Sequence, residues 1–395
     1  MSKLNLILFD DTRRDNLLPF TFTRPACDIR CGILTVREKW EKKFGVVSSS
    51  LTQEYLQKKF PLHIENENLW INGTLLFSNE IAEAVEQLGW NESLAQNGIL
   101  LAAKLDLAFS QYFSEKEILA KTTVKEFSSA VSKLNNVWDI FQLNEKAIME
   151  DFQLLTKGRL SKKVTETNRV TKHEWIFLEE GVKIENCVLN ASKGPIYIGK
   201  NTEIMEGSLI RGPFAAGENC EIKMGAKIYG ATTLGNFCKV GGEINNCVIF
   251  GYSNKAHDGF IGNSVIGEWC NLGADTNTSN LKNDYAEVKL WNYTQQKFES
   301  SGTQFCGLMM GDHSKCGINT MFNTGTVVGV SANIFGAGFP RTIIPSFSWG
   351  GAAGITDYKI DKAFDVMERV MQRRGLALSE IDKEIFTAIS TMKNK

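Results

Sequence analysis

Small or apolar residues recur at every sixth position in the second half of the chain, and this period restricts the folds that the chain can adopt. One unbroken run comprises Met310, Cys316, Phe322, Val328 and Ile334. Shorter runs comprise Ile198, Ile204 and Ile210; Ile222, Ile228, Leu234 and Val240; and Ile266 and Leu272. Helices repeat every 3.6 residues and strands every two. A period of six instead predicts a β-helix, in which each step adds a short strand and a corner and directs its apolar residue inward.

The period is lost in two stretches, at 241–260 and 279–309. Insertions in solenoids project from one face, which is often the binding face. We therefore expect both stretches to leave the solenoid as loops.

The first part of the chain follows another pattern, in which short apolar runs alternate with helix-like segments. These segments are 4–9, 33–44, 51–60, 68–71, 79–89, 98–103 and 144–156. Such alternation predicts an α/β domain with a mostly parallel sheet. A polar stretch follows, so we place the first domain at 1–157, a linker at 158–177 and the β-helix at 178–350.

Residues 351–395 are expected to form C-terminal helices. Ile360, Phe364, Met367 and Met371 have helical spacing, and Ser379 is suited to begin a second helix. This helix pair would cap the open end of the solenoid, where strand edges are otherwise unpaired.

Charge and cysteine usage exclude several classes of function. The 44 basic residues balance 45 acidic ones, for a net charge of -1, so neither nucleic acid nor an anionic membrane is an expected partner. No apolar stretch is long enough to span a membrane, and the acidic and arginine-rich start does not resemble a secretory signal, which predicts a cytoplasmic protein. Nine scattered cysteines without a C-x-x-C pair indicate reduced, buried thiols and no zinc cage.

Histidines narrow the chemistry of the β-helix. Among the four in the chain, only His257 and His313 fall on the predicted solenoid. A zinc hydratase of the left-handed β-helix type would need three, so no metal site is predicted. One imidazole can still act as the general base of an acyltransferase that activates an amine or hydroxyl towards a thioester.

The segment "NKAHDGFIGNSVIGEWCNLGADTNTSN" (254–280) resembles the active-site segment of the acetyltransferase domain of GlmU, the bifunctional glucosamine-1-phosphate N-acetyltransferase and UDP-N-acetylglucosamine pyrophosphorylase family. The whole chain is similar to the shortened GlmU-like sugar nucleotidyltransferases of bacteria. The resemblance implies that His257 is the general base. It implies that Asn271 and Asn280 bind the acceptor sugar, and that Gly273 and Ala274 contact acetyl-CoA.

Three further positions differ from the family pattern. Phe260 stands where the family usually has tyrosine, which keeps stacking area but loses a hydroxyl. Lys223 falls where an arginine binds the sugar phosphate, and Gly241 replaces a second cation. Lys239 or Lys255 is expected to compensate for that missing charge.

The first domain has a weaker resemblance, carried by "LILFDDTRRDNLLPFTFTRPACDIRCG" (6–32). Family nucleotidyltransferases have a glycine-rich phosphate loop here, whereas this chain has Asp10 and Asp11, and it has Thr74 where a metal-binding aspartate is expected. Cationic contacts to a nucleotide are predicted from Arg13, Arg14 and Arg24, with Arg30 as a further candidate. Alternatively, these arginines form a structural network with Asp10, Asp11, Asp15 and Asp28.

The expected fold is an α/β nucleotidyltransferase-like (Rossmann-like) domain, then a left-handed parallel β-helix of hexapeptide repeats with a C-terminal helical cap. The expected function is acetyl-CoA-dependent N-acetylation of a hexosamine 1-phosphate, glucosamine 1-phosphate, in UDP-GlcNAc biosynthesis. Mg²⁺ is expected only if the first domain is active. The resemblance implies a homotrimer with acetyl-CoA between protomers. Two alternatives remain: a uridylyl- or thymidylyltransferase whose β-helix only trimerises, and a non-catalytic sugar-nucleotide-binding scaffold.

Overall fold

The computed structural model describes residues 4–392. Its contacts divide the chain into two compact units, which we call the N-terminal and the C-terminal unit. The N-terminal unit comprises 1–17, 23–29 and 34–136, and the C-terminal unit comprises 18–22, 30–33 and 137–395. Two short segments from the start of the sequence therefore belong to the C-terminal unit.

The N-terminal unit is built on a six-stranded sheet, which confirms the predicted α/β class. Its strands are β1 (Asn5–Phe9), β2 (Ser48–Leu51), β3 (Glu67–Asn72), β4 (Glu92–Gln96), β5 (Ile99–Asp106) and β6 (Thr123–Glu126), in the order β2-β1-β3-β5-β4-β6. β1 is parallel to β2 and β3, and β4 is parallel to β6, whereas β5 is antiparallel to β3 and β4. The carboxyl ends of β1, β2 and β3 therefore meet at one edge of the sheet.

Helices and turns connect these strands. They are η1 (Arg14–Leu17), η3 (Ala26–Asp28), α1 (Val36–Phe44), α2 (Glu54–Gln57), α3 (Asn79–Glu86), α4 (Leu107–Ser110) and α5 (Glu115–Lys121). α1 begins with a capping box in which Thr35 accepts from the Glu38 N–H and the Glu38 carboxylate accepts from the Thr35 N–H. It ends at Gly45, whose φ of 66° is the left-handed conformation in which glycine terminates helices.

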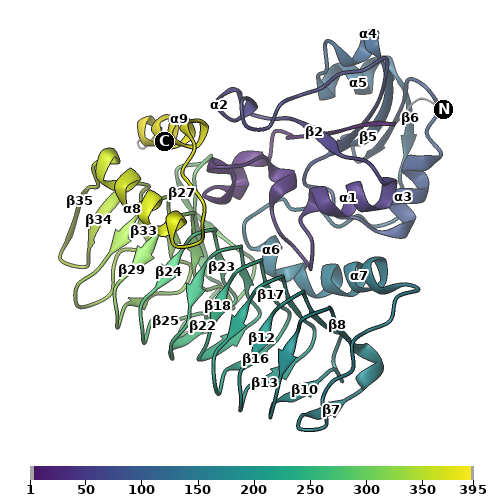
Figure 1. Ribbon diagram of the computed structural model, residues 1–395. Coiled ribbons are helices and arrows are strands. Elements are labelled where there is room, and N and C mark those ends of the chain that lie inside the picture. The colour runs from purple at the N-terminus through teal and green to yellow at the C-terminus, as the bar shows by residue number, and fades with distance from the viewer. Residues whose placement is uncertain (1–3, 393–395) are drawn as a thin grey trace. The chain divides into compact units, whose positions relative to one another are not determined.

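The C-terminal unit is the predicted left-handed parallel β-helix of hexapeptide repeats. Each coil passes through three parallel sheets, and its strands pair with those of the coils before and after it (Figure 1). The β8 sheet contains β8 (Ile176–Leu178), β11 (Ile196–Ile198), β14 (Phe214–Ala216), β17 (Thr232–Leu234), β20 (Val248–Ile249), β23 (Val265–Ile266), β28 (Met309–Met310), β31 (Val327–Val328) and β33 (Ile343–Ile344).

The other two sheets follow in each coil. The β9 sheet contains β9 (Lys183–Ile184), β12 (Glu203–Ile204), β15 (Glu221–Ile222), β18 (Lys239–Val240), β21 (Asn254–Lys255), β24 (Asn271–Leu272), β29 (Lys315–Cys316), β32 (Asn333–Ile334), β34 (Ser348–Gly351) and β35 (Gly354–Asp357). The β7 sheet contains β7 (Arg169–Thr171), β10 (Val188–Asn190), β13 (Leu209–Arg211), β16 (Lys227–Tyr229), β19 (Glu243–Asn245) and β22 (Phe260–Gly262), and the pair β25 (Asn277–Thr278) and β30 (Met321–Phe322) occupies the corresponding place in later coils.

The six-residue rows form the core of this unit, as the sequence predicted. Every member of these rows is at most 5% exposed, including Met310, Cys316 and Ile334. All nine cysteines are free and buried, and their burial agrees with the prediction. Among residues 4–392, no cluster of three or more His, Cys, Asp or Glu side chains is placed to hold a metal ion.

The prediction that residues 241–260 leave the solenoid as a loop is wrong. Residues 241–260 stay in the solenoid and contribute β19, β20 and β21. The period is lost because the coils become shorter. Leu209 pairs with Lys227, eighteen positions later, whereas Lys239 pairs with Asn254, only fifteen positions later.

The second interruption does leave the solenoid, as predicted for 279–309. It forms an antiparallel hairpin of β26 (Lys289–Asn292) and β27 (Lys297–Ser300). An isolated bridge between Leu281 and Phe305 closes its base. Val288 and Leu290 are buried, so the insertion is a packed hairpin and not an open loop.

The segment between the two predicted domains differs in detail from the expected boundaries. α6 (Asp139–Gln142) and α7 (Asn144–Thr156) cluster with the solenoid. The buried Asn144 side chain donates to the Ala231 carbonyl and accepts from the Thr233 hydroxyl, which fixes α7 to β17. The expected linker contains η4 (His173–Trp175) and β7, which pairs with β10.

The C-terminal end is helical, with α8 (Ile360–Gln372) and α9 (Glu380–Thr391), and Ser379 caps α9 as predicted. The edge of the last coil is itself covered by β35, which pairs with β34. α9 instead packs through Phe386 against His313, with ring centroids 5.2 Å apart. The helices of residues 4–392 all lack the length or the apolar character to cross a membrane.

Candidate functional site

His257 lies in the turn between β21 and β22, where the chain passes from the β9 sheet to the β7 sheet. We call residues 256–259 the His257 corner. Its His257 and Asp258 side chains are exposed, and the Asp258 carbonyl accepts from the Asp275 N–H of the next coil at 3.0 Å. In the preceding coil, Gly242 has a φ of 72°, and a Cβ there would lie 3.0 Å from the His257 carbonyl oxygen. The corner is therefore packed tightly between its neighbours while its imidazole faces solvent.

Phe260 and Asn280 meet on the outer face of β22. A Cβ placed on Gly262 would lie 2.6 Å from both the Phe260 Cζ and the Asn280 Nδ2, so both side chains cover this glycine. The Asn280 amide donates to Asn263 Oδ1 at 2.7 Å, and the Phe260 N–H donates to Asn277 Oδ1 at 2.9 Å. An aromatic ring and an amide thus flank one surface three residues beyond His257.

Gly273 and Ala274 form the equivalent corner of the next coil. A Cβ on Gly273 would lie 2.4 Å from the carbonyl carbon of Gly317, so close coil packing requires glycine at this position. The Ala274 carbonyl accepts from the Asn319 N–H at 2.8 Å. Within residues 4–392, the Ala274 N–H has no hydrogen-bond acceptor, and it is adjacent to Asp275, which contacts the His257 corner.

Asn271 lies on the other side of the corner, exposed on the outer face of β24. It pairs in register with Asn254, whose Nδ2 donates to Asn271 Oδ1 at 3.4 Å. The site residues predicted between β21 and β25, together with Asn280, therefore lie around the His257 corner in two consecutive coils.

Lys223 lies two coils earlier, at the same type of corner. Its ammonium contacts Glu221 Oε2 at 2.5 Å, and Lys239 contacts Glu221 Oε1 at 2.6 Å. Burial opposes the ionisation of Glu221, yet the hydrogen bonds from both lysines lower its pKa below the ordinary value. Gly241 separates Lys223 from the His257 corner, since a Cβ on it would lie 3.1 Å from the Lys223 Cβ and 2.6 Å from the Ala256 carbonyl oxygen.

Lys255 does not replace the missing surface cation. Its side chain is only 2% exposed and points into the solenoid core, so that expectation is wrong. The alternation of strand side chains explains this outcome, because Lys255 is in register with the inward-facing Val240. Lys239 is the partly exposed cation of the pair.

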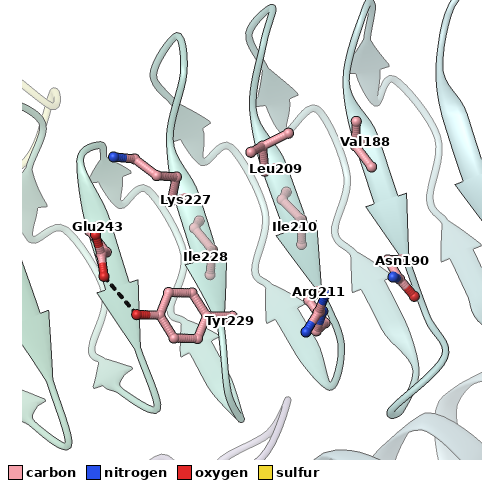
Figure 2. Close-up of a pocket in the computed structure, with 9 residues that line it drawn as sticks. All are labelled: Val188, Asn190, Leu209, Ile210, Arg211, Lys227, Ile228, Tyr229 and Glu243. Atoms are coloured by element: carbon pink, nitrogen blue, oxygen red, sulfur yellow. Dashed lines mark hydrogen bonds between the residues drawn. The ribbon is translucent and has the colours of Figure 1, made fainter.

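An open groove of about 520 Å³ runs over the outer face of the β7 sheet, across β10, β13, β16 and β19 (Figure 2). At one end, the Tyr229 hydroxyl donates to Glu243 at 2.6 Å, and this hydrogen bond raises the pKa of Tyr229 to about 12. Glu243 is in register with Phe260. The groove therefore lies on the same sheet face as the aromatic ring of the candidate acceptor site.

In the N-terminal unit, Asp10 and Asp11 follow the carboxyl end of β1. Asp10 accepts from Arg14 Nε at 3.0 Å, from the Ala26 N–H at 2.8 Å and from the Thr52 hydroxyl at 2.5 Å. Burial nevertheless raises the pKa of Asp10, although Arg14 opposes that effect. The alternative of a structural arginine network is therefore supported for Arg14, which also pairs with Asp15.

Asp11 makes a buried ion pair with Lys133 and accepts from Asn72 Nδ2 at 3.0 Å and from the Arg13 N–H at 2.9 Å. Burial opposes its ionisation, but Lys133 together with the hydrogen bonds from Asn72 and the Arg13 N–H outweighs burial, so the pKa of Asp11 is lowered. Arg13 reaches Asn135 at 2.8 Å. Because protein donors occupy both carboxylates, Asp10 and Asp11 do not form an open ligand set for Mg²⁺.

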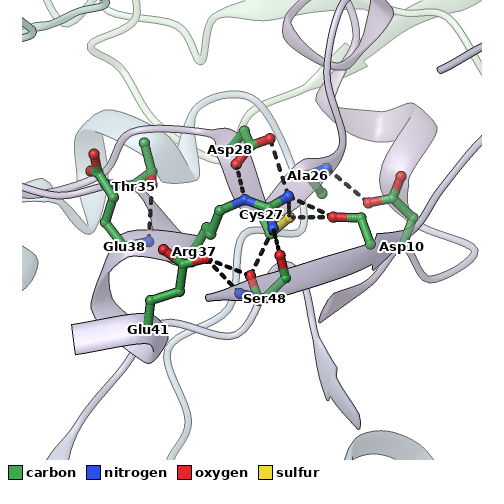
Figure 3. A network of polar contacts seen from close by, with 10 residues as sticks. Asp10, Ala26, Cys27, Asp28, Thr35, Arg37, Glu38, Glu41 and Ser48 are labelled. Atoms are coloured by element: carbon green, nitrogen blue, oxygen red, sulfur yellow. Dashed lines mark hydrogen bonds and ion pairs between the residues drawn. The ribbon is translucent and has the colours of Figure 1, made fainter. Parts of the chain in front are cut away.

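Arg24 is 7% exposed, and Asp28 pairs with Arg37 at 2.5 Å. Figure 3 shows Arg37 between Asp28 and Ser48, next to the buried Cys27. Burial raises the pKa of the Cys27 thiol well above its ordinary value, so this cysteine is no nucleophile. The cluster fixes the turn at 26–28 against β2, and the Ala26 N–H of that turn orients Asp10.

Comparisons with known proteins find a family match for the N-terminal part of the chain and a relative that matches most of its length. Residues 6–160 match the sugar nucleotidyl transferase family. A bifunctional sugar-1-phosphate nucleotidylyltransferase/acetyltransferase of Sulfurisphaera tokodaii is 34% identical over 381 residues, covering 81% of this chain and 93% of that protein. The chain belongs to this GlmU-like bifunctional transferase family.

Two other similarities cover less of the chain or are weaker. The GlmU protein of Methanocaldococcus jannaschii is 37% identical over 87 residues, which is 22% of this chain and 21% of that protein. The structure of an Arabidopsis UDP-N-acetylglucosamine acyltransferase aligns over 58% of this chain and 90% of its own, with 14% identity and a TM-score of 0.23. That TM-score is too low to carry fold or function from one protein to the other.

Within this GlmU-like chain, sequence reasoning did not identify two residues at the edge of the N-terminal sheet where β1 and β3 end, Lys133 and Asn72. Lys133 lies 122 residues after its partner Asp11, in a stretch without periodicity, and so gave no signal. Asn72 was detectable, because it ends a parallel strand next to β1. Thr74 is buried, and its hydroxyl donates to the Asn72 side chain at 2.7 Å. Thr74 therefore has a structural role here.

Proposed function

We propose that this chain transfers the acetyl group of acetyl-CoA to the amino group of a hexosamine 1-phosphate, glucosamine 1-phosphate, as a step of UDP-GlcNAc biosynthesis. The observation that carries this proposal is the His257 corner, where an exposed imidazole projects from tightly stacked coils. Phe260 and Asn280 flank it on one side, and Ala274 follows in the next coil.

The chemistry assigns each of these groups a role. The His257 imidazole takes a proton from the acceptor nitrogen as that nitrogen attacks the thioester carbonyl carbon. The Ala274 N–H is free to donate to the oxyanion that develops. When the carbon–sulfur bond breaks, the imidazolium returns its proton to the thiolate, so that free CoA and the acetamide leave.

Contacts on the acceptor follow from the same geometry. The Phe260 ring offers a stacking face for the sugar, and Asn271 and Asn280 offer amide hydrogen bonds from the two sides of the corner. The Lys223 and Lys239 ammonium groups are partly exposed cations on the β9 sheet, in the two coils that precede this corner, and they would receive the phosphate.

The experiment measures thiol release from acetyl-CoA in the presence of glucosamine 1-phosphate. His257→Ala should lower kcat by about 10²- to 10⁴-fold, the usual contribution of general acid–base catalysis. His173→Ala is the matched control, because His173 is also exposed and lies in the same unit. Wild-type activity in His257→Ala would remove this residue from the mechanism.

The match of residues 6–160 to the sugar nucleotidyl transferase family favours a second candidate function, nucleotidyl transfer to a sugar 1-phosphate. The occupied carboxylates of Asp10 and Asp11 oppose it. Pyrophosphate release from UTP or dTTP with a sugar 1-phosphate decides this question. If pyrophosphate release is lost in Lys133→Met, the activity lies at the edge of the N-terminal sheet that carries Asp11. If neither nucleotide releases pyrophosphate, the N-terminal unit is a scaffold.

A further inference from the structure

Lys255 is a charged side chain inside the apolar core of the β-helix. It occupies an inward position of β21, in register with Val240, and it is 2% exposed. Neighbouring strands of the same sheet place Val240, Leu272 and Cys316 in their inward positions. Lysine is thus an exception in a row of apolar residues.

The Lys255 ammonium has one hydrogen-bond acceptor among residues 4–392, and that acceptor belongs to His257. Nζ donates to the His257 carbonyl oxygen at 2.5 Å, two residues further along the chain. Burial lowers the pKa of Lys255 to about 8, while Asp258, Asp275 and Cys316 act in the opposite direction. Protonated or neutral, the amine retains N–H donors for this carbonyl.

Core stability does not explain a lysine at this position. A buried amine costs desolvation free energy, and an apolar residue of similar length would fill the same space without that cost. What lysine adds is a donor that holds the His257 carbonyl itself from inside the coil. The backbone bonds of this corner to neighbouring coils involve the Asp258 carbonyl, which accepts from Asp275, and the Gly259 carbonyl, which accepts from Glu243.

We propose that Lys255 is a positioning residue for His257, which it orients by holding the His257 carbonyl from within the solenoid. This inference rests on the proposed acetyl transfer. A fixed carbonyl sets the φ and ψ angles of the corner, and those angles determine the direction in which the imidazole leaves the coil. Rates of proton transfer depend steeply on that direction.

Lys315 supplies a matched control. Its Nζ donates to the His313 carbonyl oxygen at 2.9 Å, and burial lowers its pKa as well. The Lys315 bond holds a different corner, between the β8 and β9 sheets. Replacing either lysine by methionine removes an ammonium group that donates to a backbone carbonyl two residues away, but only Lys255→Met releases the His257 corner.

The first test is a double-mutant cycle on acetyl transfer. Lys255→Met should lower kcat by ~10- to ~100-fold, as expected for a displaced catalytic group, with the KM for both substrates nearly unchanged. Lys315→Met should keep kcat within a few-fold. In the His257→Ala background, Lys255→Met should have no further effect, because the lysine acts through the imidazole. Equal losses in both backgrounds would overturn the proposal and leave a structural role.

The second test does not need activity. Backbone hydrogen exchange of the peptide spanning 254–262 should accelerate in Lys255→Met and stay unchanged in Lys315→Met, with both variants folded. Unchanged exchange in Lys255→Met would overturn the proposal even if the wild-type protein acetylates no amino sugar. Wild-type kcat in Lys255→Met would overturn it while leaving the proposed function intact.

Discussion

Glu221 holds two lysines at the place where the resemblance expects cations for the sugar phosphate. Each of its carboxylate oxygens contacts one ammonium group, and both lysine side chains are about one-third exposed, at 31% and 32%. An incoming phosphate therefore meets a carboxylate that is already paired with these lysines. The local charge of the three side chains is +1 and not +2, which weakens the attraction for an anionic acceptor.

Glu221→Gln should therefore improve binding of a phosphorylated acceptor. Removing the carboxylate charge frees Lys223 and Lys239, and we expect the KM for glucosamine 1-phosphate to fall by ~3- to ~10-fold, the scale of a partly exposed ion pair. The KM for unphosphorylated glucosamine, measured in the same thiol-release assay, should not change. Equal changes for both acceptors would show that these lysines do not face the phosphate.

The titration of Lys255 should appear in the pH dependence of stability. Burial lowers its pKa to about 8 in the folded chain, from the ordinary value of 10.5 that applies to the unfolded chain. Between these values the unfolded chain binds more protons, so the free energy of unfolding rises with pH. Below pH 8 the burial penalty is fully present. Chemical denaturation at pH 7.5, 9 and 10 should show the wild-type protein gaining stability relative to Lys255→Met, and a constant difference would contradict the inward, buried placement.

At the residue scale, sequence reasoning succeeded where a repeat fixed the direction of the side chain. The apolar rows were predicted because inward positions recur every six residues. His257 was singled out because it lies where these rows break, in the segment that resembles the GlmU active site. Lys255 was expected, as an alternative to Lys239, to supply the cation missing at Gly241, but the register with Val240 shows that it faces inward. Lys133 was not predictable, since tertiary topology alone brings it to Asp11.

At the scale of elements, coil length accounts for what the sequence could and could not predict. Coils of eighteen residues keep three six-residue steps in phase, so the strands around Leu209 and Lys227 were expected. The step of fifteen residues from Lys239 to Asn254 breaks the phase without breaking the solenoid. A gap in the period therefore does not distinguish a shorter coil from an insertion such as the β26–β27 hairpin.

An aromatic column explains where the C-terminal helix α9 docks. Phe237, Tyr252, Trp269 and His313 stack along one corner, with successive ring centroids 4.9, 4.1 and 6.0 Å apart. All four residues have φ between 59° and 61°, so each occupies the same left-handed corner position in successive coils. Phe386 of α9 meets the His313 ring nearly at right angles.

Phe386→Ala should release α9 from this column. The contact is local and Phe386 is 5% exposed, so we expect faster hydrogen exchange over 380–391 with little change in the melting temperature of the solenoid. Thr387→Ala, at an exposed position of the same helix, is the control. If the whole C-terminal unit melts earlier in Phe386→Ala, then α9 is part of the global folding unit and not a separately docked cap.

At the scale of the whole molecule, the outer face of the β7 sheet is the surface on which we expect protomers to associate. Leu209 and Tyr229 expose 48% and 36% of their surface on this face. The groove that Val188, Leu209 and Tyr229 help to line lies on the same face. A second copy of the chain would cover these side chains, and the resemblance implies a trimer with acetyl-CoA between protomers.

Leu209→Glu should therefore convert a trimer into monomers, as measured by light scattering coupled to size-exclusion chromatography, because the new carboxylate would be buried at the contact. Leu160→Glu should remain trimeric, since Leu160 is 96% exposed and lies outside the β7 sheet. The monomeric variant should also lose acetyl transfer, because its coenzyme site would lack the neighbouring protomer. A wild-type monomer with full acetyl transfer would show that a single solenoid completes the site, and a Leu209→Glu trimer would place the contact on another face.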